Sequence, residues 1–330
     1  FKLTEWVHGD RMVFVLDSNY NGPHKPFLEK VIHPFRYAST ATILPYENDE
    51  VDIEGVDVTD LQRVERDPRL KRELIRTPAR STWYLFFRTK QRPFNDIRVR
   101  EAFARAIDRE VICRVVLRGT AVPAYSMLPP GFKDYAGPSY KPVQGFGPAR
   151  AKQLLRDAGY PNGRGFPKVE VWLRAPSPSI QLVGASIQGM LKEHLGIETT
   201  IRTADRTMYM DNLYNWRMNI GLVVFVADYV DPRNMLDMIW HSQPQGYGRH
   251  DWANLEFDRL VEAAASELNP ARRSQFYRQA EAILVKDYGG AFVFHPESLE
   301  LRKSWVKDTK LDRTGKVAVF DFTRVYVARH

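Results

Sequence analysis

Ile220-Gly221-Leu222-Val223-Val224 is an apolar run, and Phe225-Val226-Ala227-Asp228-Tyr229 follows it before a turn at Asp231-Pro232. A short, uninterrupted apolar run of this kind is typical of a strand that is buried on both faces. The aromatic residues and Asp228 then lie where the strand ends. In α/β sheets, ligands bind beyond the carboxyl ends of the strands. The sequence therefore predicts a ligand-binding edge at this point.

Alternating strand and helix patterns precede this run. Apolar residues at helical spacing predict an amphipathic helix over 180–195, which Gly196 ends. Strands are predicted at 169–173 and 197–202, with a short helix near 209–216. This order is typical of an α/β fold with a mostly parallel sheet covered by helices. The other main predictions are strands at 27–35, 83–87 and 291–294, helices that begin near Asp96, Pro148, Asn254 and Asn269, a second helix from Val111 to Gly119, and a long structured loop over 121–147.

Composition and charge are those of an ordinary globular protein. The 330 residues are 44% hydrophobic and 27% charged, which allows two lobes or one large domain. The net charge of +8 is dispersed along the chain, so we expect a basic surface and no nucleic-acid partner. Cys113 is the only cysteine, which excludes a disulfide framework within the chain. No segment approaches 18 uncharged apolar residues, so none is expected to span a membrane.

Catalytic and cofactor motifs are missing from the sequence. There is no Gly-x-Ser-x-Gly elbow and no His-Glu-x-x-His helix, and the eight histidines show no i, i+4 pairing. Gly145-Phe146-Gly147-Pro148 resembles a phosphate-binding loop, but it is better explained as the start of a helix. We therefore expect neither an enzyme nor a bound metal or cofactor. A metal-dependent hydrolase built on scattered His and Asp residues stays open as an alternative.

Aromatic residues gather at the predicted strand ends and their flanking loops. Any one of them is better explained by packing in a core. Together, and next to a carboxylate, they favour a cleft with apolar pockets and a few oriented polar groups. These residues are Trp83, Tyr84, Phe225, Tyr229, Trp240 and Tyr247.

Several segments together resemble one protein family in the family's own order, over almost the whole chain. The sequence is similar to the extracytoplasmic solute-binding proteins of ABC importers, family 5, which include oligopeptide- and dipeptide-binding proteins. The segments are Leu3-Thr4-Glu5-Trp6 with Gly9-Asp10, Asn95-Asp96-Ile97-Arg98-Val99-Arg100 through Ala106-Ile107-Asp108-Arg109, Pro129-Pro130-Gly131, Ala151-Lys152-Gln153-Leu154-Leu155 through Ala158-Gly159-Tyr160-Pro161, Leu195-Gly196-Ile197, Ala227-Asp228-Tyr229 with Asp231-Pro232, and Phe257-Asp258-Arg259-Leu260.

The resemblance implies a two-lobed fold of the periplasmic-binding-protein-like II class, with mixed sheets covered by helices. Residues 1–83 then form part of lobe I, 84–295 form a complete lobe II, and 296–330 return to lobe I. The early part of lobe I and an inserted subdomain have no counterpart here. We therefore expect the chain, which opens on Phe1, to be a processed or partial product of a longer protein.

The resemblance also implies roles for individual residues. Asp228 matches the aspartate that holds the α-ammonium group of a peptide, and Val224, Phe225 and Val226 would offer backbone groups to an added strand. A buried carboxylate would need such a cationic partner. The alternative for Asp228 is to cap the turn before Pro232. The other predicted ligand-binding residues are Tyr229, Trp83, Tyr84, Arg217 and His295.

The implied function is that of a receptor outside the cytoplasmic membrane. It would capture peptides in a cleft between the lobes, as a monomer when full-length, and deliver them to the membrane permease of an ABC importer. The family's long-peptide receptors place basic residues in and just before this strand to bind the ligand's C-terminal carboxylate. Here Leu222 and Val223 lie in the strand and Arg217 lies earlier, so ligand length stays open. An oligosaccharide, a nickel chelate, glutathione or an opine are the alternative ligands within the family.

Overall fold

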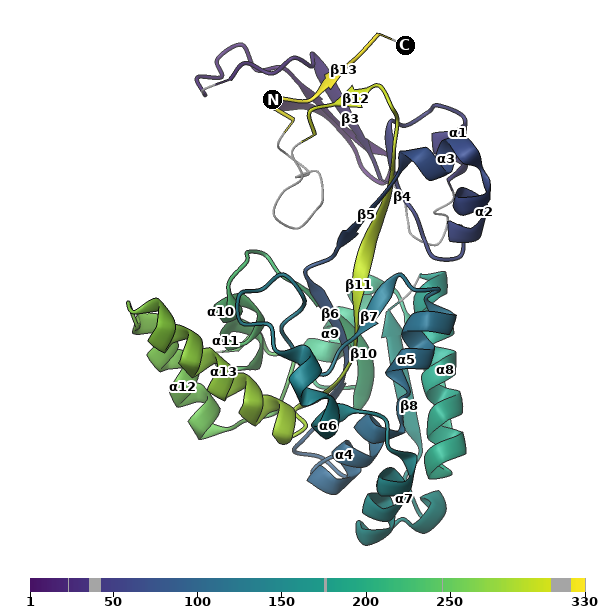
Figure 1. The fold of residues 1–330 in the computed structure, drawn as a ribbon, viewed down its shortest axis with the longest axis vertical. Coiled ribbons are helices and arrows are strands. Elements are labelled where there is room, and N and C mark those ends of the chain that lie inside the picture. The colour runs from purple at the N-terminus through teal and green to yellow at the C-terminus, as the bar shows by residue number, and fades with distance from the viewer. Residues whose placement is uncertain (23, 36–42, 175–176, 245, 310–321, 330) are drawn as a thin grey trace. The chain divides into compact units, whose positions relative to one another are not determined.

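The computed structural model describes residues 1–22, 24–35, 43–174, 177–244, 246–309 and 322–329. The chain divides into two compact units (Figure 1). Unit 1 comprises residues 1–79 and 297–330, and unit 2 comprises residues 80–296. The sequence pattern also favours β structure over the tail from 317 to 327, and part of this tail lies outside the described residues.

Unit 1 is built from short strands and small helices. Three antiparallel strands form one sheet, and a small core of Ile43, Tyr46, Val64, Leu70 and Leu301 lies under the helices. The elements of unit 1 are β1 (Lys2–Val7), β2 (Arg11–Val15), β3 (Lys30–Pro34), α1 (Leu44–Glu47), β4 (Ile53–Gly55), α2 (Leu61–Arg66), α3 (Pro68–Glu73), β5 (Leu74–Pro78), β12 (Val306–Lys307) and β13 (Tyr326–Val327).

The main sheet of unit 2 is mixed. Its strands run in the order β11, β6, β10, β8, β9, with β7 (Ala121–Pro123) also paired to β11. β8 (Val169–Arg174) is parallel to both β9 (Thr199–Ala204) and β10 (Ile220–Val226). β6 (Ser81–Phe87) is antiparallel to its two neighbours. The prediction of a mostly parallel sheet is therefore right only for β8, β9 and β10, because β6 reaches the sheet from outside the alternating strand–helix segment.

β11 (Gly290–Arg302) is a long strand that contributes to both units. In unit 2 it pairs with β6 and β7, and in unit 1 its later residues pair with β4 and β5. The border between the units, at Pro296 and Glu297, lies within this strand.

Helices cover both faces of the unit 2 sheet (Figure 1). The side chains of Tyr84, Phe86, Val223 and Phe225 lie on one face, in a core shared with the helices between α9 and α13. The opposite face packs against α8, where a Cβ atom at Gly184 would clash with Leu173. The helices are α4 (Ile97–Ala106), α5 (Arg109–Val111), η1 (Ile112–Val116), η2 (Gly137–Tyr140), α6 (Lys141–Gln144), α7 (Pro148–Asp157), η3 (Pro161–Gly163), α8 (Pro178–Leu195), α9 (Arg206–Tyr214), α10 (Pro232–Met235), α11 (Asp237–Trp240), α12 (Leu255–Ser266) and α13 (Pro270–Lys286).

Local signals account for most helix boundaries. The side chains of Asp96, Asn254 and Asn269 accept hydrogen bonds from the first backbone N–H groups of α4, α12 and α13, which satisfies donors that have no partner within the helix. Gly196 ends α8 in the left-handed conformation, with φ at 69°. The second predicted helix, from Val111 onward, is instead a single α-turn followed by the π-turn η1. The predicted 121–147 loop contains β7, η2 and α6.

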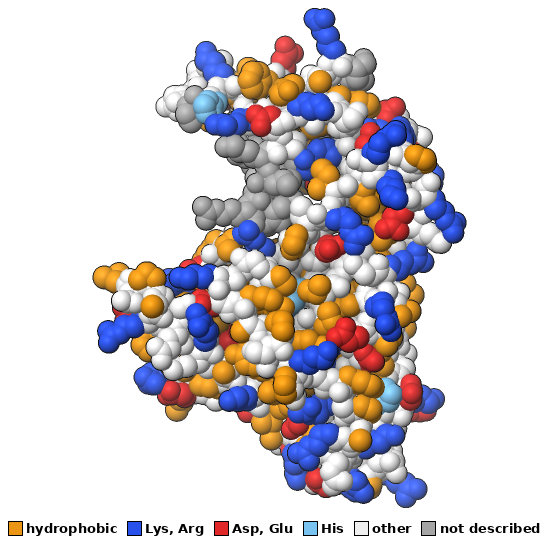
Figure 2. Space-filling model, viewed as in Figure 1, with side chains coloured by type: hydrophobic (Ala, Val, Ile, Leu, Met, Phe, Trp, Pro, Cys, Tyr) orange, Lys and Arg blue, Asp and Glu red, His pale blue; other side chains and the backbone are white. Residues whose placement is uncertain are grey.

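Basic side chains are spread over the visible face of the molecule, with acidic side chains between them (Figure 2). No helix among the described residues has the length and apolar character that crossing a membrane requires. Within the same residues, no group of three or more His, Cys, Asp or Glu side chains is placed to hold a metal ion.

Candidate functional site

The last residues of β10 have no neighbouring strand on one side. β10 pairs with β6 along its whole length, from Ile220 to Val226, but its pairing with β8 stops at Leu222. β8 itself pairs with β9 as far as Arg174. Between Val223 and Val226, no strand in the described part of the chain pairs with the side of β10 that faces away from β6.

The backbone groups on this side belong to alternate residues. The N–H of Ala227 donates to Arg80 across the β6 pair, and the N–H of Arg88 donates to Asn219. Odd-numbered residues of β10 therefore point their backbone groups toward β6, and even-numbered residues point theirs away. Val224 and Val226 thus present backbone N–H and C=O groups on the open side, which we call the open edge.

One carbonyl of the open edge already has a partner. The Nη1 of Arg249 donates to the carbonyl of Val224 at 3.3 Å. The carbonyl of Leu222, which lies just before the open edge, accepts a hydrogen bond from the hydroxyl of Tyr209 at 2.9 Å. Val226 is 51% exposed. The open edge is therefore accessible at its carboxyl end.

Phe225 was predicted to offer its backbone groups to an added strand, and the structure differs. Its backbone groups face β6, where it pairs with Thr82, and its ring is buried in the core. The Arg249 guanidinium lies over this ring, 5.4 Å from its centre, and Tyr247 packs against it edge-on. Phe225 therefore cannot offer its backbone to an added strand. Its ring instead supports Arg249.

Asp228 follows the open edge and is exposed. Its Oδ2 accepts a hydrogen bond from Nδ2 of Asn234 at 3.1 Å, while its backbone N–H donates to Oδ1 of Asn234 at 2.9 Å. Asn234 is fully buried on α10, so it holds the Asp228 side chain in place. The expectation of a buried carboxylate is wrong for this structure, because the carboxylate faces solvent.

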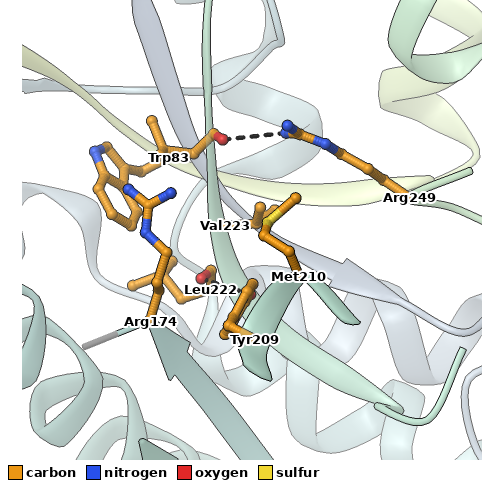
Figure 3. A pocket seen from close by; sticks show the side chains of 8 residues that line it. Trp83, Arg174, Tyr209, Met210, Leu222, Val223 and Arg249 are labelled. Atoms are coloured by element: carbon orange, nitrogen blue, oxygen red, sulfur yellow. Dashed lines mark hydrogen bonds between the residues drawn. The ribbon is translucent and has the colours of Figure 1, made fainter. Parts of the chain in front are cut away.

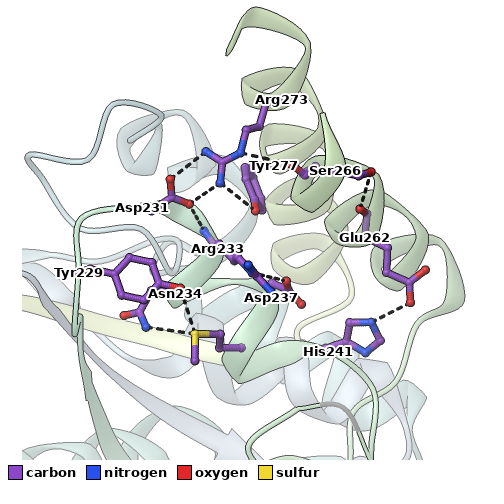
Figure 4. Close-up of polar contacts among 12 residues, drawn as sticks. Tyr229, Asp231, Arg233, Asn234, Asp237, His241, Glu262, Ser266, Arg273 and Tyr277 are labelled. Atoms are coloured by element: carbon purple, nitrogen blue, oxygen red, sulfur yellow. Dashed lines mark hydrogen bonds and ion pairs between the residues drawn. The ribbon is translucent and has the colours of Figure 1, made fainter. Parts of the chain in front are cut away.

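The turn before Pro232 is capped by Asp231 and not by Asp228. Oδ1 of Asp231 accepts from the N–H of Arg233 at the start of α10, and Arg273 of α13 donates to both carboxylate oxygens at 2.7 and 2.8 Å (Figure 4). Burial alone would raise the pKa of Asp231, but the hydrogen bonds from Arg273 and from the Arg233 N–H outweigh it and lower the pKa. Asp231 therefore supplies the backbone cap at Pro232, while the Asp228 carboxylate contacts the side chain of Asn234 on the other side of the turn.

Two of the predicted aromatic residues lie near this edge. Tyr229 is 43% exposed, and its hydroxyl donates to Sδ of Met238 at 3.2 Å. Trp83 pairs with Val224 across β6 and β10 and stacks on Phe294. Both residues are placed to contact a ligand that lies along the open edge.

Tyr84 and His295 are buried in unit 2. The hydroxyl of Tyr84 hydrogen-bonds to Nε2 of His250 at 3.0 Å, and Nδ1 of His295 lies 3.0 Å from the hydroxyl of Thr82. Burial lowers the pKa of His295 to about 3, so its ring is neutral at ordinary pH. Both side chains have roles in the core, and neither has a face exposed to a ligand.

Arg217 lies at the other end of β10. It precedes the first residue of the strand, whereas Asp228 follows the last one. At about 3.3 Å per residue, the strand alone separates them by roughly 20 Å. Arg217 forms an exposed ion pair with Asp211 at 3.0 Å. The structure therefore does not bring Arg217 together with the other predicted site residues.

Three residues at the edge were not predicted from the sequence, namely Asn234, Arg174 and Arg249. Arg174 and Arg249 line a pocket of about 20 Å³ with Trp83, Tyr209 and Val223 (Figure 3). Arg174 could have been found, because it ends the strand beside β10. Asn234 and Arg249 come from segments without a periodic pattern, so the sequence does not indicate where their side chains point.

A larger hollow lies within unit 1. Its volume is about 1380 Å³, and apolar side chains of β1, β2 and β3 contribute to its walls. None of the predicted site residues lines it.

Comparison with known proteins identifies the family. A family model described as bacterial extracellular solute-binding proteins, family 5, middle, matches residues 1–247. The oligopeptide-binding protein OppA of Bacillus subtilis is 23% identical over 317 residues, which cover 94% of this chain and 57% of that protein. Heme-binding protein A of Haemophilus influenzae is 28% identical over 234 residues, covering 69% of this chain and 41% of that protein.

A solved structure has the same fold. The periplasmic binding protein DppA of Helicobacter pylori, in complex with the peptide STSA, matches with a TM-score of 0.85 at 23% identity, over the whole of this chain and 62% of that one. The predicted α/β fold class is confirmed. The chain spans between 41% and 61% of the length of the curated relatives it matches. This chain belongs to family 5 of the bacterial extracellular solute-binding proteins.

Proposed function

We propose that the full-length protein is a receptor of an ABC importer that captures peptides outside the cytoplasmic membrane and delivers them to the membrane permease. The observation that carries this proposal is the open edge of β10 beside the exposed carboxylate of Asp228. An extended peptide can add a strand to such an edge, with main-chain hydrogen bonds that do not depend on its sequence. Asp228 then accepts a charge-assisted hydrogen bond from the peptide's ammonium group.

The named relatives support this class of ligand. OppA of Bacillus subtilis is named an oligopeptide-binding protein, and the DppA structure of Helicobacter pylori holds a peptide. A receptor for a different solute within the same family is the second candidate, because heme-binding protein A shows that members at similar identity take other ligands. Catalysis is not part of the proposal, since the family consists of binding proteins. The proposal includes that the full-length protein acts as a monomer.

The open edge also defines the residues we propose as the binding site. Val224 and Val226 offer backbone groups, Asp228 binds the ammonium group, and Trp83 and Tyr229 contact the ligand's side chains. Tyr84, Phe225 and His295 support the site from the core. The sequence analysis places lobe II at residues 84–295, between two parts of lobe I. This assignment remains a prediction, and the structure divides the chain at slightly different positions, with unit 2 at residues 80–296.

The test is a peptide titration of the full-length protein followed by calorimetry. The Val226→Pro variant lacks the N–H that faces the open side, and no strand pairs there in the described residues, so the fold should tolerate the change. We expect affinity for a tetrapeptide to fall about tenfold, the value of one hydrogen bond of about 1.4 kcal/mol. Val226→Thr keeps the N–H and serves as the control.

A second arm changes the ligand in place of the protein. Tetrapeptides methylated at single backbone nitrogens lose one donor each, and some of them should bind at least tenfold more weakly than the parent. Equal binding of all the methylated peptides, together with an unchanged Val226→Pro variant, would rule out strand addition. Tight binding of a non-peptide solute and of no peptide would favour the second candidate.

A further inference from the structure

Met238 lies on α11, beside the residues that follow the open edge. Its Sδ accepts one hydrogen bond from the hydroxyl of Tyr229 at 3.2 Å and another from Nδ2 of Asn234 at 3.4 Å. Figure 4 shows the side chains of Tyr229 and Asn234 next to each other, with dashed lines to this sulfur atom. A thioether sulfur is a weak acceptor with two lone pairs, so the two donors occupy both of them.

The same amide nitrogen of Asn234 also holds Asp228. Nδ2 of Asn234 donates to Oδ2 of Asp228 at 3.1 Å, and Oδ1 of Asn234 accepts from the Asp228 backbone N–H at 2.9 Å. An amide nitrogen carries two hydrogens, so Asp228 uses one and Met238 uses the other. Asn234 is fully buried, which leaves it no bulk water to replace a lost partner. A line of hydrogen bonds therefore runs from Met238 through Asn234 to Asp228.

Solvent reaches the sulfur end of this line. Met238 is partly exposed, whereas Met235, three residues earlier, is fully buried. Peroxides oxidise accessible methionine to its sulfoxide, which turns an apolar side chain into a polar and chiral one. Outside the cytoplasmic membrane, where the proposed function places the protein, such oxidants are not removed by the thiols that keep the cytosol reducing.

We infer that Met238 is an oxidation site that controls ligand binding at Asp228. This inference rests on the proposed function, because it assigns a regulation to the same site. In the reaction, Sδ of Met238 donates an electron pair to one oxygen of hydrogen peroxide, an S–O bond forms and the O–O bond breaks. The proton on the transferred oxygen passes to the leaving hydroxide. The methionine is thereby oxidised to the sulfoxide, and the peroxide is reduced to water.

The added oxygen disturbs the line of hydrogen bonds. It replaces one lone pair of the sulfur, so it points toward the Tyr229 hydroxyl in one epimer and toward the Asn234 amide in the other. The donors lie 3.2 and 3.4 Å from Sδ, which leaves too little space for an inserted oxygen at ordinary hydrogen-bond length. One donor must move. A displaced Asn234 moves the Asp228 carboxylate, and a displaced Tyr229 moves a ring that we place against the ligand.

The experiment is peroxide treatment of the full-length protein, followed by removal of the peroxide and titration with a tetrapeptide that lacks Met, Cys and Trp. Mass spectrometry measures the oxidised fraction of Met238. We expect the oxidised wild type to bind the tetrapeptide about five- to tenfold more weakly, which corresponds to the loss of one hydrogen bond. The N-acetylated tetrapeptide should lose less affinity. Methionine sulfoxide reductases A and B, which each reduce one epimer, should restore binding.

Two leucine variants test whether the response comes from Met238. Met238→Leu keeps an apolar side chain of similar size without the sulfur, so its affinity should not respond to peroxide. Met190→Leu is the matched control, because Met190 on α8 is also partly exposed and its Sδ accepts from the N–H of Asp108 at 3.4 Å. This control should respond to peroxide as the wild type does.

Four results would overturn the inference. They are a peroxide response that persists in Met238→Leu, a Met238 that stays reduced while Met190 is oxidised, an unchanged affinity after full oxidation of Met238, and an equal loss for the free and the acetylated tetrapeptide. The last result would show that the oxidation does not act through Asp228.

A peptide-free measurement separates this inference from the proposed function. The backbone N–H of Asp228 gives a signal in the NMR spectrum of protein with ¹⁵N-labelled aspartate, and its absence in Asp228→Asn assigns it. Oxidation should shift this signal in the wild type and in Met190→Leu, but not in Met238→Leu. Such a shift supports the inference even where no peptide binds, in which case the peptide function alone fails. An unmoved signal in protein with oxidised Met238 contradicts the inference.

Discussion

Asp228 has a carboxylate oxygen that is available to a ligand, whereas Asp231, in the same loop, does not. Asp231 is fully used by Arg273 and by the start of α10, whereas Asp228 is held by Asn234 through one oxygen and faces solvent with the other. A carboxylate that is oriented in advance loses little side-chain freedom when a ligand binds. In the proposed site, Asp228 is therefore available to the ligand, while Asp231 caps α10 and binds Arg273.

Replacement of Asp228 should affect only ligands with a free amino terminus. Asp228→Asn removes the charge but keeps an oxygen for Asn234, so we expect free peptides to bind about 10–100-fold more weakly, and acetylated peptides to be little affected. Calorimetry of both peptide forms measures the difference. Asp211→Asn, an exposed aspartate near the opposite end of β10, is the control. Equal losses for both peptide forms would contradict an ammonium-binding role.

Arg273 should stabilise the fold because its guanidinium, by hydrogen bonds to both oxygens of Asp231, joins α13 to the start of α10. Arg273→Met leaves Asp231 partly buried without its cation, and we expect a loss of about 1–2 kcal/mol in the free energy of unfolding, since both partners keep some exposure. Urea unfolding measures this change. Arg259→Met removes an exposed pair with Glu256 and should have little effect on the free energy of unfolding. Equal losses of unfolding free energy in the two variants would show that the bidentate Arg273–Asp231 pair stabilises the fold no more than an exposed ion pair does.

At the scale of elements, α13 is tied to the loop after β7 by a buried carboxyl group. Oε1 of Glu281 accepts from the backbone N–H of Leu128 at 2.9 Å, and the side chain is fully buried. Burial raises the pKa of Glu281 to about 7. The folded protein therefore holds a proton here between about pH 4.5 and 7 that the unfolded chain releases.

This proton makes stability depend on pH in a defined direction. A raised folded-state pKa contributes stability below the unfolded-state value, and that contribution is lost as the pH rises through 7. Glu281→Gln should become more stable relative to the wild type between pH 5 and 8, by roughly 3 kcal/mol at most. Urea unfolding of both proteins across this range provides the test. His250 and His295 titrate in both proteins, so their effects cancel in the difference. A constant difference would contradict the raised pKa.

At the scale of the molecule, unit 2 contains its own core. The large cluster from Tyr84 to Phe292 comes entirely from residues 80–296. We expect this segment, produced alone, to unfold in one cooperative step, with tryptophan fluorescence and circular dichroism giving the same midpoint. A fragment of residues 84–295 lacks Ser81, Thr82 and Trp83, which pair with the end of β10, and should be less stable. Non-coincident transitions in the longer fragment would contradict an independent unit.

The sequence was sufficient to predict β10, its flanking strands and helices, and the helix caps, because periodicity and capping are local properties. It could not predict the open edge, which depends on β8 ending its pairing at Leu222 while β6 continues to Val226. It also could not separate exposed from buried aromatic residues. Tyr84 and Trp83 are adjacent in β6 and lie on opposite faces of the sheet, and both faces are covered by helices. Arg249 reaches the site from a loop 25 residues after Val224, which no pattern indicates.

The division of β11 between the two units imposes an order on synthesis. β4 and β5 leave the ribosome early, but their partner, residues 297–302, follows only after all of unit 2 has been made. At about 5–20 residues per second, this delay is roughly 10–40 s. Unit 2 has time to fold during translation, while the edges of β4 and β5 wait for their strand. A nascent chain stalled with residues from Glu297 onward still inside the ribosome should therefore resist protease within unit 2 and remain sensitive at β4 and β5.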